Sequence, residues 1–143
     1  MPASRYRGRC ACGQVSYEAS ADPYRMVNCH CRDCQRASGS GYAALCAFHK
    51  DNITLTGELR YYRSISERGM AIERGFCATC GNPMTIRPHA QPNALYIFAA
   101  SLDDPALHKP TANIWTKSAH PWDHMDPALP RLETTTPPSP PPR

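Results

Sequence analysis

Short runs in which apolar and polar residues alternate recur along the chain, and most of them end at a glycine or a proline. Residues 14–19 alternate in this way, and residues 41–48 form a run of small and apolar side chains. Alternation with a period of two is typical of half-buried β-strands, because successive side chains of a strand point to opposite faces. We therefore expect strands over both ranges.

The later part of the chain repeats the pattern. Six more strands are predicted, over residues 53–56, 59–62, 70–76, 83–87, 95–100 and 113–115. Gly57 and Glu58 separate the first two of these strands, which is the spacing of a β-hairpin. Many short strands between Gly and Pro turns favour a mainly β, antiparallel fold, either a sandwich or a small barrel.

Helix is sparse in this pattern. Residues 32–37 indicate one turn of helix. Residues 103–107 indicate another, with Asp103 as its cap and Pro105 early in it.

Composition indicates one small domain with a thin apolar core. The chain has 143 residues, few of them Leu, Ile, Val or Phe, and a formal net charge of only +4. Low hydrophobicity without high charge argues against a disordered chain. We place the domain at residues 4–132. Residues 133–143 are rich in Pro and Thr and predict a disordered extension, or alternatively a ligand for a proline-binding domain.

Several partners are not expected. The N-terminus has no apolar signal segment, and no stretch approaches the roughly 18 apolar residues of a membrane span. We therefore expect a soluble, cytoplasmic protein with no membrane partner. The Lys and Arg residues are scattered without a basic run, so no nucleic-acid partner is expected.

Seven of the eight cysteines lie in three tight clusters, which are the main candidates for chemistry. The clusters are Cys10-Ala-Cys12, Cys29-His-Cys31-Arg-Asp-Cys34 and Cys77-Ala-Thr-Cys80. Thiols this close in sequence can bind one metal ion together, and they stay reduced in an intracellular compartment. Seven sulfurs divide into a closed set of four and an open set of three. For zinc, this division separates a structural site from a reactive one.

The first and last clusters predict the closed site. Cys10, Cys12, Cys77 and Cys80 form two pairs, and a glycine follows each pair and permits a tight turn behind the second sulfur. Such a site would join the start of the chain to its middle. The alternative is that each pair binds a metal separately or forms disulfides.

The middle cluster predicts a zinc ion with three protein ligands, which is the arrangement of catalytic zinc sites. In an extended segment Cys29 and Cys31 point to one side, and Cys34 follows from the next turn. His30 then points away and supports the ligands or packs in the core. The alternative is a closed site whose fourth ligand is Cys46, His49, His120 or His124. As part of an apolar run, Cys46 is also expected to pack as a small hydrophobic residue.

An open three-thiolate zinc has a limited chemistry. Three thiolates make the centre anionic, so it is a weak Lewis acid and is better suited to holding another thiolate. A substrate thiol at the fourth position would lose its proton and remain a nucleophile toward a small aldehyde.

Four segments resemble one known family, and together they cover about residues 5–132. They read Gly8-x-Cys10-x-Cys12-Gly13-x-Val15-x-Tyr17, Cys29-His-Cys31-x-x-Cys34-Gln-Arg-Ala-Ser-Gly39, Phe76-Cys77-x-x-Cys80-Gly81 and Lys117-Ser118-Ala-His-Pro121-Trp122. The chain is similar here to the glutathione-dependent formaldehyde-activating enzyme family, whose members include centromere protein V. The resemblance implies a β-tent fold with two zinc ions, a structural one on the set of four cysteines and a catalytic one on the set of three.

The resemblance also implies an activity and partners. The family's named reaction joins glutathione and formaldehyde into S-hydroxymethylglutathione and is classed as a carbon–sulfur lyase reaction. We therefore expect a zinc-dependent carbon–sulfur lyase or synthase that acts on glutathione, or another small thiol, and its aldehyde adduct. The alternative is a zinc-stabilised binding or thiol-sensing module without catalysis.

Three residues near the middle cluster and the last motif are predicted to contact substrate. Arg32 and Arg36 would meet the two carboxylates of glutathione, and Trp122 would line the pocket. The alternative is that the arginines are solvated and the tryptophan packs in the core. His120 departs from the family pattern, in which a less polar residue is expected before the Pro-Trp pair.

Overall fold

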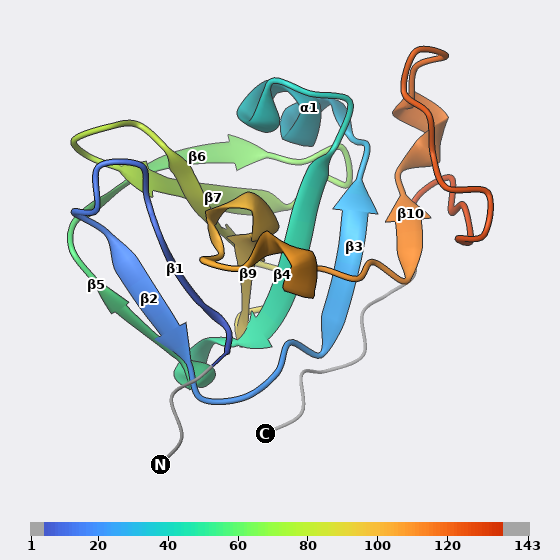
Figure 1. The fold of residues 1–143 in the computed structure, drawn as a ribbon. Helices are drawn as coiled ribbons and strands as arrows, with labels where there is room; N and C mark the ends of the chain where they lie inside the picture. Colours follow the sequence, from blue (N-terminus) through green and yellow to red (C-terminus); the bar gives the residue numbers. More distant parts are fainter. Residues whose placement is uncertain (1–4, 136–143) are drawn as a thin grey trace.

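Two β-sheets form the body of the protein in a computed structural model that describes residues 5–135 (Figure 1). The smaller sheet is antiparallel and has the order β1-β2-β5, with β1 at Arg7–Arg9, β2 at Ser16–Ala19 and β5 at Ile53–Thr56. Each strand is short because a cysteine knuckle, a glycine or a proline follows within a few residues.

The larger sheet has seven strands in the order β10-β3-β4-β9-β8-β7-β6. Their bounds are β3 Arg25–Cys29, β4 Ala43–His49, β6 Leu59–Ile65, β7 Ala71–Cys77, β8 Pro83–Pro88, β9 Ala94–Phe98 and β10 Ala112–Ile114. Neighbouring strands are antiparallel except β3 and β10, which run parallel. The predicted mainly β, antiparallel fold is confirmed.

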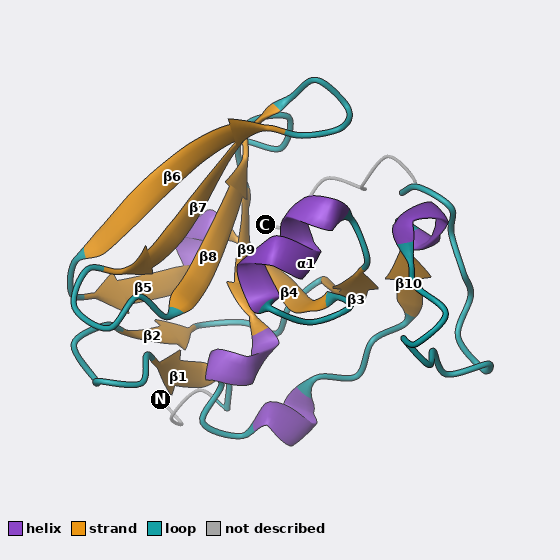
Figure 2. Cartoon of the chain, turned by 90° about the horizontal axis from the view of Figure 1, so that it is seen from above, coloured by secondary structure: helices purple, strands orange, loops and turns teal. Residues whose placement is uncertain are grey.

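Helical structure within residues 5–135 is limited to α1 and four short 3₁₀ turns. Helix α1 spans Arg32–Ser38 and packs beside β4 (Figure 2). The 3₁₀ turns are Lys50–Asn52, Ala99–Ser101, Pro105–Leu107 and Thr116–Ser118. The turn predicted at 32–37 is therefore a helix of two turns. It is closed by Gly39, whose φ of 68° lets its N–H reach the Gln35 carbonyl.

The core divides between the two faces of the seven-stranded sheet. Along β4, Cys46 and Phe48 face one cluster of buried side chains, which includes Tyr17 of the smaller sheet. Leu45 and Ala47 alternate with them and face a second cluster, which includes Cys29, Cys34 and Phe98. A central strand with both faces buried explains why residues 41–48 lack polar side chains.

The predicted hairpin between residues 53–56 and 59–62 is wrong. Strand β5 pairs with β2, and β6 pairs with β7, so the two strands belong to different sheets. Gly57 lies at the crossing with a φ of 102°, and its backbone lies directly against the carbonyl of Gln14. The glycine marks a change of sheet here, and a two-residue spacing does not distinguish that from a tight hairpin turn.

The predicted cap at Asp103 is also wrong by one residue. The side chain of Asp104 accepts the N–H of Ala106 at 3.2 Å and so caps the turn Pro105–Leu107. Asp103 instead lies 3.7 Å from the guanidinium of Arg7. Strands β1 and β3 are not predicted from the sequence pattern. The strand predicted at 95–100 corresponds to β9, which ends at Phe98.

The first residues of the predicted C-terminal extension contact the body. Thr134 and Glu133 accept backbone hydrogen bonds from Trp115 and Lys117 at 3.0 and 3.3 Å, and the Thr135 hydroxyl accepts a side-chain hydrogen bond from Arg25 at 3.1 Å. Residues 136–143, which hold most of that extension, lie outside the described residues.

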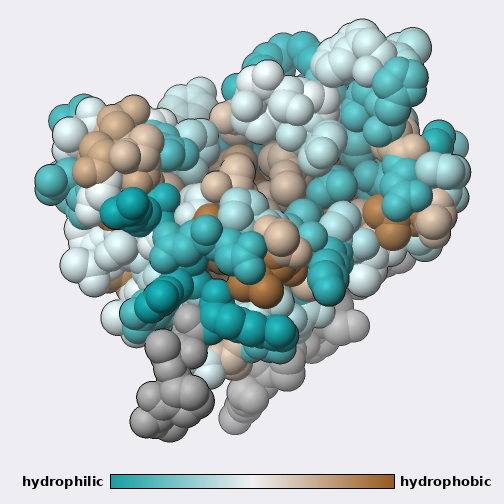
Figure 3. All heavy atoms as spheres, viewed as in Figure 1, coloured by the Kyte–Doolittle hydropathy of each residue, from teal (hydrophilic) through white to brown (hydrophobic). Residues whose placement is uncertain are grey.

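The surface is mixed in character. On the face drawn in Figure 3, polar residues surround several separate small apolar areas. No helix within residues 5–135 is long and apolar enough to span a membrane.

Candidate metal centres and the adjoining cavity

The structure brings the four cysteines of the first and last clusters into one group. The sulfurs of Cys10, Cys12, Cys77 and Cys80 lie within 4.8 Å of one another. Cys12 Sγ lies 3.6 Å from Cys10 Sγ and 3.7 Å from Cys77 Sγ. Four ligands on a tetrahedral zinc with Zn–S bonds of about 2.3 Å stand about 3.8 Å apart, so the donor set fits this metal. All eight cysteines are free thiols, so the predicted alternative of disulfides is not observed.

Two backbone knuckles present these sulfurs. Cys10 follows β1, and the N–H of Val15 donates to its sulfur at 3.3 Å. Cys77 ends β7 and accepts the N–H of Cys80 at 3.4 Å. N–H donors directed at sulfur stabilise thiolates, which are the metal-binding form. Glycines at positive φ, Gly13 and Gly81, make the two tight turns.

The middle cluster forms the second group. Cys29 ends β3, Cys31 is the N-cap of α1, and Cys34 lies in the first turn of that helix. Their sulfurs also lie within 4.8 Å of one another, and no fourth His, Cys, Asp or Glu among residues 5–135 joins them. The predicted alternative of a fourth ligand from Cys46, His49, His120 or His124 is therefore not supported by the described geometry.

The three sulfurs of the middle cluster share protons. Hydrogen bonds from the thiols of Cys29 and Cys34 lower the pKa of the Cys31 thiol to about 3, and the backbone N–H of Cys34 adds a donor at 3.3 Å. The same bond to Cys31 raises the pKa of Cys29 well above its ordinary value. Because metal binding displaces such protons, a divalent cation suits this set and would hold all three sulfurs as thiolates.

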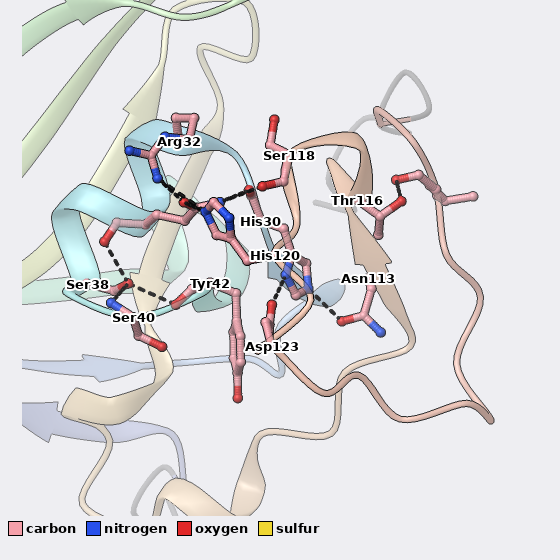
Figure 4. Close-up of polar contacts among 12 residues, drawn as sticks. His30, Arg32, Ser38, Ser40, Tyr42, Asn113, Thr116, Ser118, His120 and Asp123 are labelled. Carbon is pink, nitrogen blue, oxygen red and sulfur yellow. Dashed lines mark hydrogen bonds and ion pairs between the residues drawn. The ribbon is translucent and has the colours of Figure 1, made fainter.

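His30 is directed away from the three sulfurs, as the alternation predicts. It is fully buried, with Nδ1 2.7 Å from the Asp123 carboxylate and Nε2 2.9 Å from Asn113 Oδ1 (Figure 4). Both partners come from near the C-terminal end of the described chain. The ring therefore anchors the loop between Cys29 and Cys31 to that distant segment.

Gln35 makes a second link to the same segment. Its Nε2 donates to the backbone carbonyls of His30 and Ser118 at 2.7 and 3.0 Å, and its Oε1 accepts from His120 Nε2 at 2.8 Å. The Arg32 guanidinium also donates to this oxygen. Gln35 thus joins the middle cysteine motif to the Lys117–Trp122 motif.

A cavity of about 720 Å³ opens beside the three-cysteine group. Cys29, Cys31 and Cys34 line it. Apolar and aromatic side chains form much of the remaining wall, among them Leu45, Ile72, Ile86, Tyr96, Ile114 and Trp115. Trp115 is the non-glycine residue of the described chain with a positive φ, 58°, and such strain is common at ligand sites. An apolar cavity with a few convergent polar groups is typical of small-molecule sites.

The predicted substrate contacts lie elsewhere. Arg32, Arg36 and Trp122 line a second, more open hollow of about 420 Å³ and do not line the cysteine cavity. Trp122 is 64 % exposed and stacks on His120 with ring centroids 4.9 Å apart. A role of these three residues in substrate binding stays a prediction. The arginines that line the cysteine cavity are Arg25, Arg68 and Arg74.

Arg74 is the functional candidate that sequence reasoning missed. It lies in the middle of β7, and its Nη2 stands 4.0 Å from Cys34 Sγ. The two residues are 40 positions apart, and nothing in the alternation of β7 distinguishes Arg74 from an ordinary polar residue facing solvent.

Comparisons with known proteins agree with this geometry. The family model described as "Glutathione-dependent formaldehyde-activating enzyme" matches residues 5–118. No curated protein matches the chain. A structural-genomics crystal structure of a Rhodobacter sphaeroides protein shares the fold with a TM-score of 0.56 and 22 % identity, covering 73 % of this chain and 96 % of that one. Because the family model spans most of the chain and both cysteine groups, the protein belongs to the glutathione-dependent formaldehyde-activating enzyme family.

Proposed function

We propose that this protein is a zinc-dependent carbon–sulfur lyase or synthase that acts on glutathione-type thiol adducts such as S-hydroxymethylglutathione. One observation carries the proposal: three cysteine sulfurs within reach of one ion line a cavity, and no fourth side-chain ligand from residues 5–135 joins them. Membership of the family supports the choice of glutathione and formaldehyde as reactants.

Cys29, Cys31 and Cys34 would hold the catalytic zinc. When bound, the metal would supply a fourth position at which a substrate thiol loses its proton at neutral pH. The substrate sulfur attacks the aldehyde carbon and forms the C–S bond, while the C=O π pair moves to oxygen, which takes up a proton to replace the one the thiol lost. Breaking the same C–S bond reverses the reaction.

Apolar side chains of the cavity would shield the reactants. The wall that includes Ile72, Ile86 and Trp115 would limit the access of water to the reacting sulfur. A thiolate that is less hydrated is a stronger nucleophile toward a small aldehyde. Arg74, whose Nη2 lies 4.0 Å from Cys34 Sγ, makes the part of the cavity beside the cysteines favourable to an anionic thiol.

The second group of cysteines would hold a structural zinc. Cys10 and Cys12 follow β1 of the smaller sheet, whereas Cys77 ends β7 of the larger one and Cys80 follows it. One ion on these four sulfurs would tie the two sheets together.

The proposal can be tested with the zinc-loaded chain. Glutathione binding is measured by isothermal titration calorimetry, and the exchange between glutathione, formaldehyde and their adduct is measured by NMR exchange spectroscopy. We expect the wild type to bind glutathione and to accelerate the exchange above the spontaneous rate. Cys31→Ser should lose both properties while keeping one zinc ion.

Cys46→Ala is the matched control, because it removes a thiol that belongs to neither group. It should bind glutathione and accelerate the exchange like the wild type. A Cys31→Ser protein with wild-type binding and exchange would contradict the proposal. Glutathione binding by the wild type without any acceleration would favour a thiol-sensing module instead.

A further inference from the structure

One cation contacts the three-cysteine group from across the cavity. Arg74 is half-buried, and its Nη1 lies 3.5 Å from Ser64 Oγ while its Nη2 lies 4.0 Å from Cys34 Sγ. Its buried Nε–H has no acceptor among residues 5–135. Arg74 lines the cavity, and each Nη carries a second N–H beyond its contact with Ser64 or Cys34, so donors remain for an acceptor on a ligand.

No carboxylate of the described chain forms an ion pair with Arg74. Two acids, Asp33 and Glu67, line the same cavity, and Glu67 lies 3.3 Å from Lys117 Nζ. A half-buried guanidinium beside a cavity is stabilised by a nearby anion, and the described chain offers it only the cysteine sulfurs, so a bound anion would complement its charge.

The other two arginines of the cavity are less suited to this role. Arg68 is exposed, and Arg25 directs its Nη2 to Thr135 Oγ1 at 3.1 Å. No contact between either of them and a cysteine sulfur is described. Arg74 alone of the three stands where it can meet a ligand whose sulfur has reached Cys29, Cys31 and Cys34.

We propose that Arg74 is the specificity-determining residue of this cavity: it pairs with the carboxylate of a thiol whose sulfur is held at the three-cysteine site, and so selects anionic over neutral thiols. This inference rests on the proposed function, because it takes the thiol site as given. It assigns the carboxylate to a guanidinium on β7, in place of the α1 arginines that the sequence favours.

The test compares two thiols that share the same mercaptopropionyl chain but differ in charge, 3-mercaptopropionate and its methyl ester, by isothermal titration into the zinc-loaded chain. We expect the wild type to bind the acid more tightly than the ester. Arg74→Gln should lose about 10- to 100-fold of its affinity for the acid and keep its affinity for the ester, because it removes a charge-assisted, bidentate hydrogen-bond donor. Arg25→Gln is the matched control, since it removes the same charge from the same cavity, and it should keep the preference for the acid.

Zinc content and the thermal unfolding midpoint confirm that each variant is folded and loaded. If Arg74→Gln fails either check, Arg74→Lys is tested in its place, because lysine keeps the positive charge but lacks the planar guanidinium that forms two parallel hydrogen bonds with a carboxylate. It should lose part of the affinity for the acid and none for the ester, and unchanged affinity for the acid would contradict the inference.

Other outcomes would also overturn it. Arg74 is excluded as the carboxylate partner if Arg74→Gln keeps the preference for the acid, whatever Arg25→Gln does, or if Arg74→Gln weakens the binding of both thiols equally. Equal affinity of the wild type for the acid and the ester would contradict the role of Arg74 but not the proposed function. A wild type that binds neither thiol removes the proposed function as well.

Discussion

At the scale of single residues, Cys46 differs from the other seven cysteines because it belongs to neither metal-binding group. Cys46 has no exposed surface, and this burial raises the pKa of its thiol to about 12. Its sulfur lies 3.5 Å from His108 Nδ1, and His108 Nε2 lies 3.0 Å from Asn28 Oδ1. Cys, His and Asn form the catalytic set of some proteases, but a protonated thiol that lines neither cavity has no access to substrate. Cys46 therefore packs in the core as a small hydrophobic residue, as its position in an apolar run predicts.

His108 should make stability depend on pH. Burial lowers the pKa of its imidazole below the usual value of about 6.5. Between the lowered pKa of His108 in the folded protein and its usual value of about 6.5 in the unfolded chain, the unfolded chain binds a proton that the folded protein does not. The free energy of unfolding therefore falls as the pH drops below about 6.5. Replacing His108 with Gln should remove up to about 1 kcal/mol of this fall per pH unit, measured by chemical denaturation of the zinc-loaded proteins. Identical slopes for the two proteins would exclude His108 as the titrating group.

At the scale of elements, the joint between the two sheets depends on a glycine. Strands β5 and β6 are separated by two residues, yet they belong to different sheets. A Cβ on Gly57 would lie 2.1 Å from the carbonyl oxygen of Gln14, and the φ of 102° is itself unfavourable for other residues. The path from one sheet to the other therefore leaves no room for a side chain.

Gly57→Ala should accordingly lower the free energy of unfolding by at least about 2 kcal/mol, since it combines a clash with backbone strain. Gly69→Ala is the matched control, because Gly69 also has a positive φ, 77°, but its side-chain position is open. It should lose only about 1 kcal/mol. Denaturant unfolding of the zinc-loaded proteins measures both values, and equal losses would show that the crossing tolerates a side chain.

At the scale of the whole molecule, the two cysteine groups lie on opposite faces of the seven-stranded sheet. Cys10 and Cys77 belong to the core cluster shared with the smaller sheet, whereas Cys29 and Cys34 belong to the cluster beside α1. The first group joins segments 65 residues apart, and the second spans only six consecutive residues. Loss of the first group would thus separate the sheets, and loss of the second would change one loop.

Cys77→Ser should therefore unfold the protein or make it insoluble. A structural zinc contributes roughly 10–16 kcal/mol of apparent binding free energy, which is comparable to the whole stability of a domain. Cys31→Ser should stay folded, with a far-ultraviolet circular dichroism spectrum like that of the wild type. Soluble yield and thermal unfolding midpoint measure the difference, and equal loss of folding in both variants would argue against the division into structural and reactive sites.

Much of the fold and of the metal-binding groups can be predicted from the sequence because the signals are local. The apolar run at 41–48 predicts β4, and the short runs at 53–56, 83–87 and 113–115 predict β5, β8 and β10, with boundaries close to those observed. Cysteines two or three residues apart can share an ion whatever the rest of the chain does, so Cys29, Cys31 and Cys34 are found by spacing alone. The partner of the β5 strand is not a local property, and the hairpin prediction fails for that reason.

The residues around the metal groups were decided by tertiary structure. Arg74, Asp123 and Asn113 each reach the middle cluster from a distant segment, and no periodicity identifies them. Arg32 and Arg36 are next to the cluster in sequence, but they lie on the exposed side of α1, while the cavity is on the side facing β7. The sequence by itself determined which sulfurs gather and that strands carry them, because both depend on nearest neighbours along the chain. The placement of β7 across the cavity from α1, and of the C-terminal segment beside α1, decided which charges face those sulfurs, because that placement depends on contacts between residues far apart in the chain.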